Sequence, residues 1–179
     1  MSRRPGQAGA TNAFSSHPIR RFGVIGAGQM GQGIAQVAAL TGLEVQLSDI
    51  DQATAQKGKD SIAKALARLV EKERMRGDER DALLGRIHPV ADVAALSQAD
   101  LAVEAATENL ELKLKLLAAA DAALPAGAIL ASNTSSISIT RLGASTSRPE
   151  RVVGMHFMNP VPLMKLCEIV RGVQTSDDT

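Results

Sequence analysis

Short apolar runs alternate with longer amphipathic stretches from Arg21 to the end of the chain, which predicts strands and helices in turn. The apolar runs predict strands at residues 22–25, 44–48, 86–90, 101–104, 128–131, 151–157 and 164–170. The amphipathic stretches predict helices at residues 29–41, 52–75, 109–123 and 136–142, with a break at Gly77-Asp78 and a restart over 79–84. Strands that alternate with helices predict a mostly parallel sheet covered by helices on both faces.

The last two predicted strands are joined differently from the others. Their connection holds Pro160 and Pro162 and is too short to contain a crossover helix. Because parallel neighbours need such a crossover, we predict that this pair is antiparallel. The sheet should therefore end in an antiparallel pair on its C-terminal side.

Composition and charge narrow the choice of partners. The chain has 179 residues, which suits one domain, and only three aromatic residues, so the core must rest on Ala, Leu, Val, Ile and Met. Lys and Arg number 20 against 19 Asp and Glu, a balance that gives no argument for a nucleic-acid or membrane partner. No apolar stretch approaches the roughly 20 residues that span a bilayer.

Residues 1–20 and the single cysteine bear on the compartment. Residues 1–20 hold Arg3, Arg4 and Arg20 without an acidic residue, which predicts a disordered tail or, as the alternative, a targeting segment. Cys167 is the only cysteine, so it forms no intramolecular disulfide and no cysteine-based metal site, and we expect no metal. It is interpreted as a buried small residue or a reactive thiol. A reducing, cytoplasmic location is the natural expectation.

The strongest local motif is a glycine loop between the first strand and the first helix. Gly26, Gly28 and Gly31 stand at the spacing of a dinucleotide-binding turn, with Gln29 and Met30 between the last two. The first glycine permits the tight turn, the second lets a pyrophosphate approach the backbone, and the third lets helix and strand pack closely. The helix N-terminus then offers N–H groups to phosphate. The fold expected is a Rossmann-type, doubly wound α/β sheet.

An acidic residue follows at the end of the second predicted strand. Asp49 comes 18 residues after Gly31, within the usual spacing of the acid that binds the adenosine ribose. Its carboxylate would repel a 2′-phosphate, so NAD is favoured over NADP. The alternative is that Asp49 caps a helix that begins at Ile50. Asp51 is interpreted as a solvated helix start.

Four blocks of sequence carry a resemblance to a known family. They are residues 24–36, residues 100–105 with Glu108, Asn109 and Lys113, residues 132–136, and residues 156–166. In order and spacing across residues 21–172 they resemble the 3-hydroxyacyl-CoA dehydrogenases, and within them the bacterial 3-hydroxybutyryl-CoA dehydrogenases. The resemblance implies NAD-dependent interconversion of (S)-3-hydroxyacyl-CoA and 3-ketoacyl-CoA.

The resemblance also implies the catalytic residues. His156 matches the family's base, and imidazole, which titrates near pH ~6.5 when unperturbed, suits that role. Glu168 matches the glutamate that orients the histidine; the alternative is an exposed edge-strand glutamate. Ser135 matches a serine that hydrogen-bonds the substrate's C3 oxygen, while the same serine-rich run would otherwise cap a helix through Ser136. Asn159 either contacts substrate or holds the loop.

Two further residues are implied as cofactor contacts. Glu108 and Lys113 match positions near the ribose and nicotinamide. The alternative is that they form a pair on a solvated helix.

The family also implies more than this chain contains. Its members continue as a helical domain that forms a homodimer and closes the acyl-CoA cleft, whereas this chain ends at Thr179. We therefore expect residues 21–179 to be the NAD-binding domain of an enzyme with an acyl-CoA substrate. Two alternatives remain: an NAD-binding module without turnover, and a related sugar-acid dehydrogenase of the gulonate type.

Overall fold

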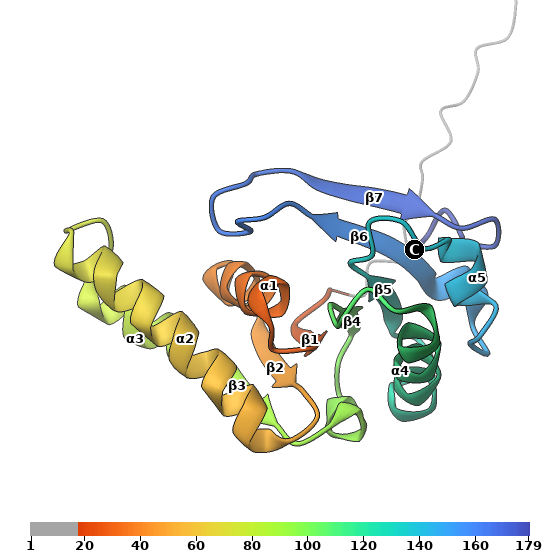
Figure 1. Ribbon diagram of the computed structural model, residues 1–179, viewed down its shortest axis with the longest axis horizontal. Coiled ribbons are helices and arrows are strands. Elements are labelled where there is room, and N and C mark those ends of the chain that lie inside the picture. The colour runs from red at the N-terminus through yellow and green to blue at the C-terminus, as the bar shows by residue number, and fades with distance from the viewer. Residues whose placement is uncertain (1–17) are drawn as a thin grey trace, which may run out of the picture.

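The computed structural model describes residues 18–179, so the expectation of a tail over residues 1–20 falls almost entirely outside the described residues. The described part is built around a seven-stranded sheet with the order β3-β2-β1-β4-β5-β6-β7 (Figure 1). The strands are β1 Arg21–Ile25, β2 Glu44–Ser48, β3 Ile87–Val90, β4 Leu101–Glu104, β5 Ile129–Ser132, β6 Val152–Phe157 and β7 Cys167–Arg171. The helices are α1 Gln29–Leu40, α2 Gln52–Glu71, α3 Gly77–Gly85, α4 Leu110–Ala123 and α5 Ile139–Gly143, with 3₁₀ turns η1 Val93–Leu96 and η2 Pro149–Arg151.

The sheet has the predicted topology. Every neighbouring pair is parallel except β6 and β7, which are antiparallel. The chain runs outward from β1 to β2 and β3, then returns to place β4 on the other side of β1. This reversal leaves a crevice beyond the carboxyl ends of β1 and β4, where open α/β sheets bind their ligands. The predicted fold class is confirmed.

Helices cover both faces of the sheet and give two cores (Figure 1). On one face, buried side chains of α1, α2 and α3 pack on the strands, with Ile34, Ile62 and Leu83 at most 2% exposed. On the other, α4 and α5 contribute Leu117 and Leu142. Both cores consist mainly of Ala, Val, Leu and Ile, as the scarcity of aromatic residues requires.

Three predicted element boundaries were wrong. The helix predicted over 52–75 ends at Glu71, and Gly77 begins α3 instead of breaking a helix. The break lies at residues 72–76, where Glu73 adopts a left-handed backbone with φ 55°. The last strand starts at Cys167, because Leu163 and Met164 donate their N–H groups to the Pro160 carbonyl in a turn.

The third boundary concerns the predicted helix over 136–142. It starts at Ile139, and its N-cap is Ser138, which accepts a hydrogen bond from the Arg141 N–H. Ser136, predicted as the cap, instead donates its hydroxyl to Glu108. Tertiary contact with an acidic side chain therefore decided which serine caps the helix. Within residues 18–179, no helix combines the length and apolarity needed to cross a membrane.

Candidate functional site

The glycine loop has the geometry of a phosphate-binding turn. Gly26 has φ 104°, a left-handed conformation that favours glycine, and an added Cβ would lie 3.0 Å from the Ala105 carbonyl. A Cβ on Gly31 would lie 1.7 Å from the Gly26 carbonyl oxygen, so close helix–strand packing requires glycine there. A Cβ on Gly28, by contrast, would meet no atom of the described residues within 4 Å. The open approach to Gly28 fits a ligand phosphate.

The start of α1 supports the same reading. Gly28 is its N-cap, and within residues 18–179 no side chain caps this helix end. The amide groups of the first turn therefore face the open side of the loop, where the helix dipole favours an anion. The residues present fit a dinucleotide pyrophosphate.

Asp49 lines a cavity of about 280 Å³ beside this loop. Its Oδ2 accepts a hydrogen bond of 2.6 Å from the Ala27 N–H, and its Oδ1 accepts one of 2.7 Å from the Ile50 N–H. The alternative of Asp49 as a helix cap was wrong, because α2 begins at Gln52 and Asp51 caps it by accepting from the Thr54 N–H. Hydrogen bonds from the backbone N–H and from the side chain of Thr54 lower the pKa of Asp51. The cavity is lined by Ile25, Gly26, Gly28, Asp49, Ile50, Val93, Ala105, Ala106, Thr107, Leu112 and Leu116.

His156 and Glu168 form a hydrogen-bonded pair. The antiparallel register places them directly opposite each other on β6 and β7. His156 Nδ1 lies 2.9 Å from Glu168 Oε2. A carboxylate only accepts, so Nδ1 carries the hydrogen and Nε2 of the neutral ring is left as an acceptor. The Glu168 side chain is 51% exposed on the edge strand. Glu168 is therefore both an exposed edge-strand residue and the hydrogen-bond partner of His156.

A second cavity of about 310 Å³ is lined by three of the four predicted catalytic residues, all except Glu168. His156, Ser135 and Asn159 line it, together with Met30, Glu108 and Lys113 from the predicted cofactor set. The remaining lining residues are Ala105, Ala106, Asn133, Phe157 and Met158. Ala105 and Ala106 line both cavities, which therefore meet at the loop after β4.

The Gln29 side chain contacts Asn159. Its Nε2 donates to the Asn159 Oδ1 at 3.3 Å, which links the start of α1 to the loop between β6 and β7. One contact therefore connects the glycine loop with the loop that follows His156.

The alternative that Lys113 and Glu108 form a pair on a solvated helix was wrong. The Lys113 side chain is 1% exposed, and Glu108 precedes α4 instead of lying on it. Lys113 Nζ lies 2.8 Å and 2.9 Å from the two carboxylate oxygens of Glu104, and 3.2 Å from Glu108 Oε2. Sequence reasoning gave Glu104 no role. The available signal was a charged residue in a fully apolar strand, since a buried charge needs a partner.

Glu108 in turn holds the loop after β5. Its Oε1 accepts hydrogen bonds from the Thr134 hydroxyl, from the Ser135 N–H at 3.2 Å and from the Ser136 hydroxyl at 3.1 Å. Partial burial opposes its ionisation, but hydrogen bonds from Thr134 and Lys113 outweigh burial and lower the pKa of Glu108. Glu108 is therefore a carboxylate at neutral pH.

Asn133, also given no role from the sequence, ties the end of β5 to β6. Its Oδ1 accepts a 2.9 Å hydrogen bond from the N–H of Phe157, the neighbour of His156. Cys167, opposite Phe157, is half-buried. Burial and the adjacent Glu168 charge raise the pKa of the Cys167 thiol, which disfavours a reactive thiolate.

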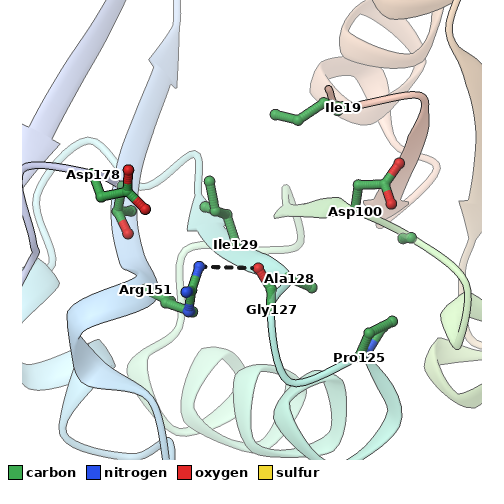
Figure 2. Close-up of a pocket in the computed structure, with 10 residues that line it drawn as sticks. Ile19, Asp100, Pro125, Gly127, Ala128, Ile129, Arg151 and Asp178 are labelled. Carbon is green, nitrogen blue, oxygen red and sulfur yellow. Dashed lines mark hydrogen bonds between the residues drawn. The ribbon is translucent and has the colours of Figure 1, made fainter. Parts of the chain in front are cut away.

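A further cavity lies away from these residues. Its volume is about 480 Å³, and it opens at the amino ends of the parallel strands (Figure 2). On one side of it, Arg151 donates a hydrogen bond of 3.0 Å to the Gly127 carbonyl, beside Asp178 and Ile129. None of the predicted site residues lines it. Within residues 18–179, no three His, Cys, Asp or Glu side chains are grouped so that they could hold a metal ion.

Comparisons with known proteins agree with this geometry. The family model described as the NAD-binding domain of 3-hydroxyacyl-CoA dehydrogenase matches residues 21–179. A probable 3-hydroxybutyryl-CoA dehydrogenase of Deinococcus radiodurans is 50% identical over 159 residues, which are 89% of this chain and 57% of the relative. A probable 3-hydroxybutyryl-CoA dehydrogenase of Bacillus subtilis is 44% identical over 90% of this chain and 56% of its own length.

A solved structure gives the same result. The crystal structure of an (S)-3-hydroxybutyryl-CoA dehydrogenase from Ralstonia eutropha matches with a TM-score of 0.87 and 49% identity, over 89% of this chain and 56% of that one. The chain thus spans little more than half the length of these relatives.

Proposed function

Because the chain belongs to the family of 3-hydroxyacyl-CoA dehydrogenase NAD-binding domains, we propose that it is the cofactor-binding part of an enzyme that interconverts (S)-3-hydroxyacyl-CoA and 3-ketoacyl-CoA. The observation that carries this proposal is the His156–Glu168 pair, 2.9 Å apart, because His156 lines the cavity that meets the glycine-loop cavity. The whole enzyme would act on an acyl-CoA and would be a homodimer. Both are inferences from the family resemblance.

The cofactor of the family is NAD, and five residues of the glycine loop would hold its pyrophosphate. They are Gly26, Gly28, Gln29, Met30 and Gly31. Asp49, on the wall of the neighbouring cavity, would accept hydrogen bonds from the adenosine ribose and repel a 2′-phosphate. When bound, NAD supplies the acceptor for a hydride from substrate C3.

His156 would act as the base. With Nδ1–H donated to Glu168, its Nε2 is free to take the proton of the substrate hydroxyl, and to return it in the reverse reaction. The Glu168 carboxylate fixes the tautomer and stabilises the imidazolium that forms. Removing the proton from the oxygen is what allows C3 to release a hydride.

Ser135 and Asn159 would place the substrate. The Ser135 backbone is held by Glu108 while the residue lines the His156 cavity, so its hydroxyl is available for the C3 oxygen. Asn159 Oδ1 is engaged by Gln29, which leaves its amide NH₂ to face a ligand. A substrate oxygen held between these groups and His156 would be oriented for proton transfer.

The test is a steady-state assay on the full-length polypeptide that contains this chain. NADH oxidation with acetoacetyl-CoA should be rapid, whereas NAD reduction with L-gulonate should be negligible. Turnover of gulonate alone would replace the acyl-CoA proposal by a sugar-acid dehydrogenase. NADH binding without turnover of either compound would leave a cofactor-binding module.

A further inference from the structure

Three charged residues lie beneath the proposed site, and the mechanism above does not use the deepest of them. Glu104 ends β4 with a side chain that is 0% exposed, and Lys113 on α4 is 1% exposed. Glu108 closes the group at the surface with 41% of its side chain exposed. The group spans the distance from the sheet interior to the cavity that His156 lines.

Glu104 is fully engaged. Its Oε1 accepts from Lys113 Nζ at 2.8 Å and from the Ala106 N–H at 2.7 Å. Its Oε2 accepts from Lys113 Nζ at 2.9 Å and from the Ser132 hydroxyl at 2.7 Å. It therefore contacts residues at the ends of β4, β5 and α4. Two hydrogen bonds to its carboxylate hold the Lys113 ammonium in place.

Lys113, held in place by Glu104, also contacts Glu108. Its ammonium lies 3.2 Å from Glu108 Oε2, while the other oxygen of the same carboxylate holds Thr134, Ser135 and Ser136. One carboxylate thus faces the buried lysine on one side and the serine-bearing loop on the other. Without Lys113 nothing else among these contacts would fix the Glu108 side chain from the protein interior.

We infer that Glu104 is a positioning residue, which fixes Lys113 and through it Glu108, so that the loop of Ser135 is set in place before any ligand binds. The inference rests on the proposed function where it assigns Ser135 a role in turnover. The ordering of the loop itself does not depend on that function. The competing account is a purely structural ion pair, in which Glu104 only neutralises the Lys113 charge.

A pair of substitutions separates these accounts. Glu104→Gln alone leaves a buried ammonium with one carboxylate, so this variant should be strongly destabilised. Glu104→Gln combined with Lys113→Met removes both charges and replaces the lysine by an apolar chain of similar length. Replacing a buried ion pair by such residues is often neutral for stability, so the double variant should unfold at nearly the temperature of the unsubstituted protein.

The decisive readout is amide hydrogen exchange of residues 133–137 in the full-length protein without cofactor. The double variant should exchange there about tenfold faster, since the Ser135 N–H then bonds to an unanchored Glu108. Its kcat for acetoacetyl-CoA should fall by about tenfold, as expected for a slight misplacement of the substrate oxygen. Thr175→Val, which removes the buried hydrogen bonds of the Thr175 hydroxyl with the Val152 carbonyl and the Gly172 N–H and touches none of the Glu104 contacts, should change neither.

Unchanged exchange and unchanged kcat in a stable double variant would overturn the inference, because charge neutralisation alone would then explain Glu104. Glu104→Asp keeps the charge but withdraws it by one methylene. It should remain folded and loosen the same loop to a smaller extent, so the test stands even if both glutamine variants fail to fold; unchanged exchange in Glu104→Asp would then count against the inference. If the unsubstituted protein does not turn over acyl-CoA, the proposed function fails while the exchange measurement still decides the role of Glu104.

Discussion

At the scale of single residues, the cofactor preference should depend on Asp49. We expect NAD to bind better than NADP, and Asp49→Ala to narrow the difference by about tenfold, the worth of a hydrogen bond to a charged group. Fluorescence titration with both reduced cofactors measures it. Asp51→Ala is the matched control, because Asp51 caps α2 two residues away and lies outside the cavity. Equal affinities of the unsubstituted protein for the two cofactors would remove the ribose role from Asp49.

His156 should control turnover without controlling cofactor binding. We expect His156→Gln to lower kcat by roughly 10²–10⁴, the usual contribution of a general base, with NADH affinity nearly unchanged. Glu168→Gln should also lower kcat, because a neutral amide stabilises an imidazolium poorly. His88→Gln is the control: this exposed histidine also faces a glutamate, Glu44 at 2.9 Å, but on β3 and β2. Near-normal kcat in His156→Gln would refute the proposed base.

The sequence predicted the residues around the cavity better than the residues that hold them in place. The family resemblance indicated His156, Glu168 and Ser135; the structure brings the first two into contact, and His156 and Ser135 line one cavity. Glu104 and Asn133 were missed because their partners, Lys113 and Phe157, are 9 and 24 residues away on other elements, and only the fold brings them together. Periodicity cannot show which buried polar groups meet.

At the scale of elements, helix α1 and the loop after β6 are fitted closely to each other. A Cβ on Gly33 would lie 2.7 Å from the Val161 Cβ, a separation that forces the loop to move. We expect Gly33→Ala to destabilise the protein by about 1–3 kcal/mol, the usual cost of overpacking, and to lower kcat by displacing Asn159. Denaturant unfolding and a steady-state assay measure the two effects.

A compensating change makes this prediction specific. Val161→Gly removes the Cβ and Cγ2 atoms that the new Cβ would meet at 2.7 Å and 3.0 Å, so Gly33→Ala with Val161→Gly should be less destabilised than the sum of the two single variants. Gly77→Ala is the control, since a Cβ there meets no atom of the described residues within 4 Å. Strict additivity of the Gly33 and Val161 effects would show that the contact does not matter.

The end of α4 is joined to the segment before β6 by an ion pair with a defined pH dependence. Asp121 Oδ1 lies 2.6 Å from Arg148 Nε, with side chains 12% and 11% exposed. Burial opposes ionisation, but hydrogen bonds from Ser147 and Arg148 outweigh it and lower the pKa of Asp121. Its stabilising contribution is therefore complete above the unfolded value near pH ~3.9, and is lost as pH falls toward the folded pKa.

We expect Asp121→Asn to lower the free energy of unfolding by about 3 kcal/mol at neutral pH, since it leaves Arg148 without its counter-charge. The loss should shrink as the pH falls below ~3.9, where the unsubstituted protein also loses the charge. Urea unfolding across this pH range measures it. Asp81→Asn, in an exposed pair with Arg80, should cost at most about 1 kcal/mol. A loss that is constant with pH would contradict the assignment.

Elements were predictable where local pattern and fold agree. The strands of the parallel sheet and the antiparallel final pair follow from apolar runs and from the length of the last connection. The end of α2 and the start of α5 do not. Glu73 and Ser138 occupy positions that the helical periodicity does not mark, and the contact of Ser136 with Glu108 overrides its capping preference.

At the scale of the whole molecule, β7 and the loop before it expose an apolar surface. β7 is the edge strand of the sheet and pairs only with β6 (Figure 1). Four of its five residues are exposed. The exposed apolar side chains of this region are Leu163, Met164, Leu166, Ile169, Val170 and Val173. A surface of this kind indicates contact with another part of a protein or with a second molecule. It adjoins His156 through the pairing of β6 with β7.

The proposed function requires that NAD, held at the glycine loop, oxidises a 3-hydroxyacyl-CoA held beside His156. The most direct measurement is NADH formation from NAD by the full-length protein, with (S)-3-hydroxybutyryl-CoA and its (R) isomer in parallel. The proposed function requires NADH formation with the (S) isomer at a rate of at least about 1 s⁻¹, within the usual range for enzymes, and negligible NADH formation with the (R) isomer. A protein that binds NAD yet forms no NADH with the (S) isomer would contradict it.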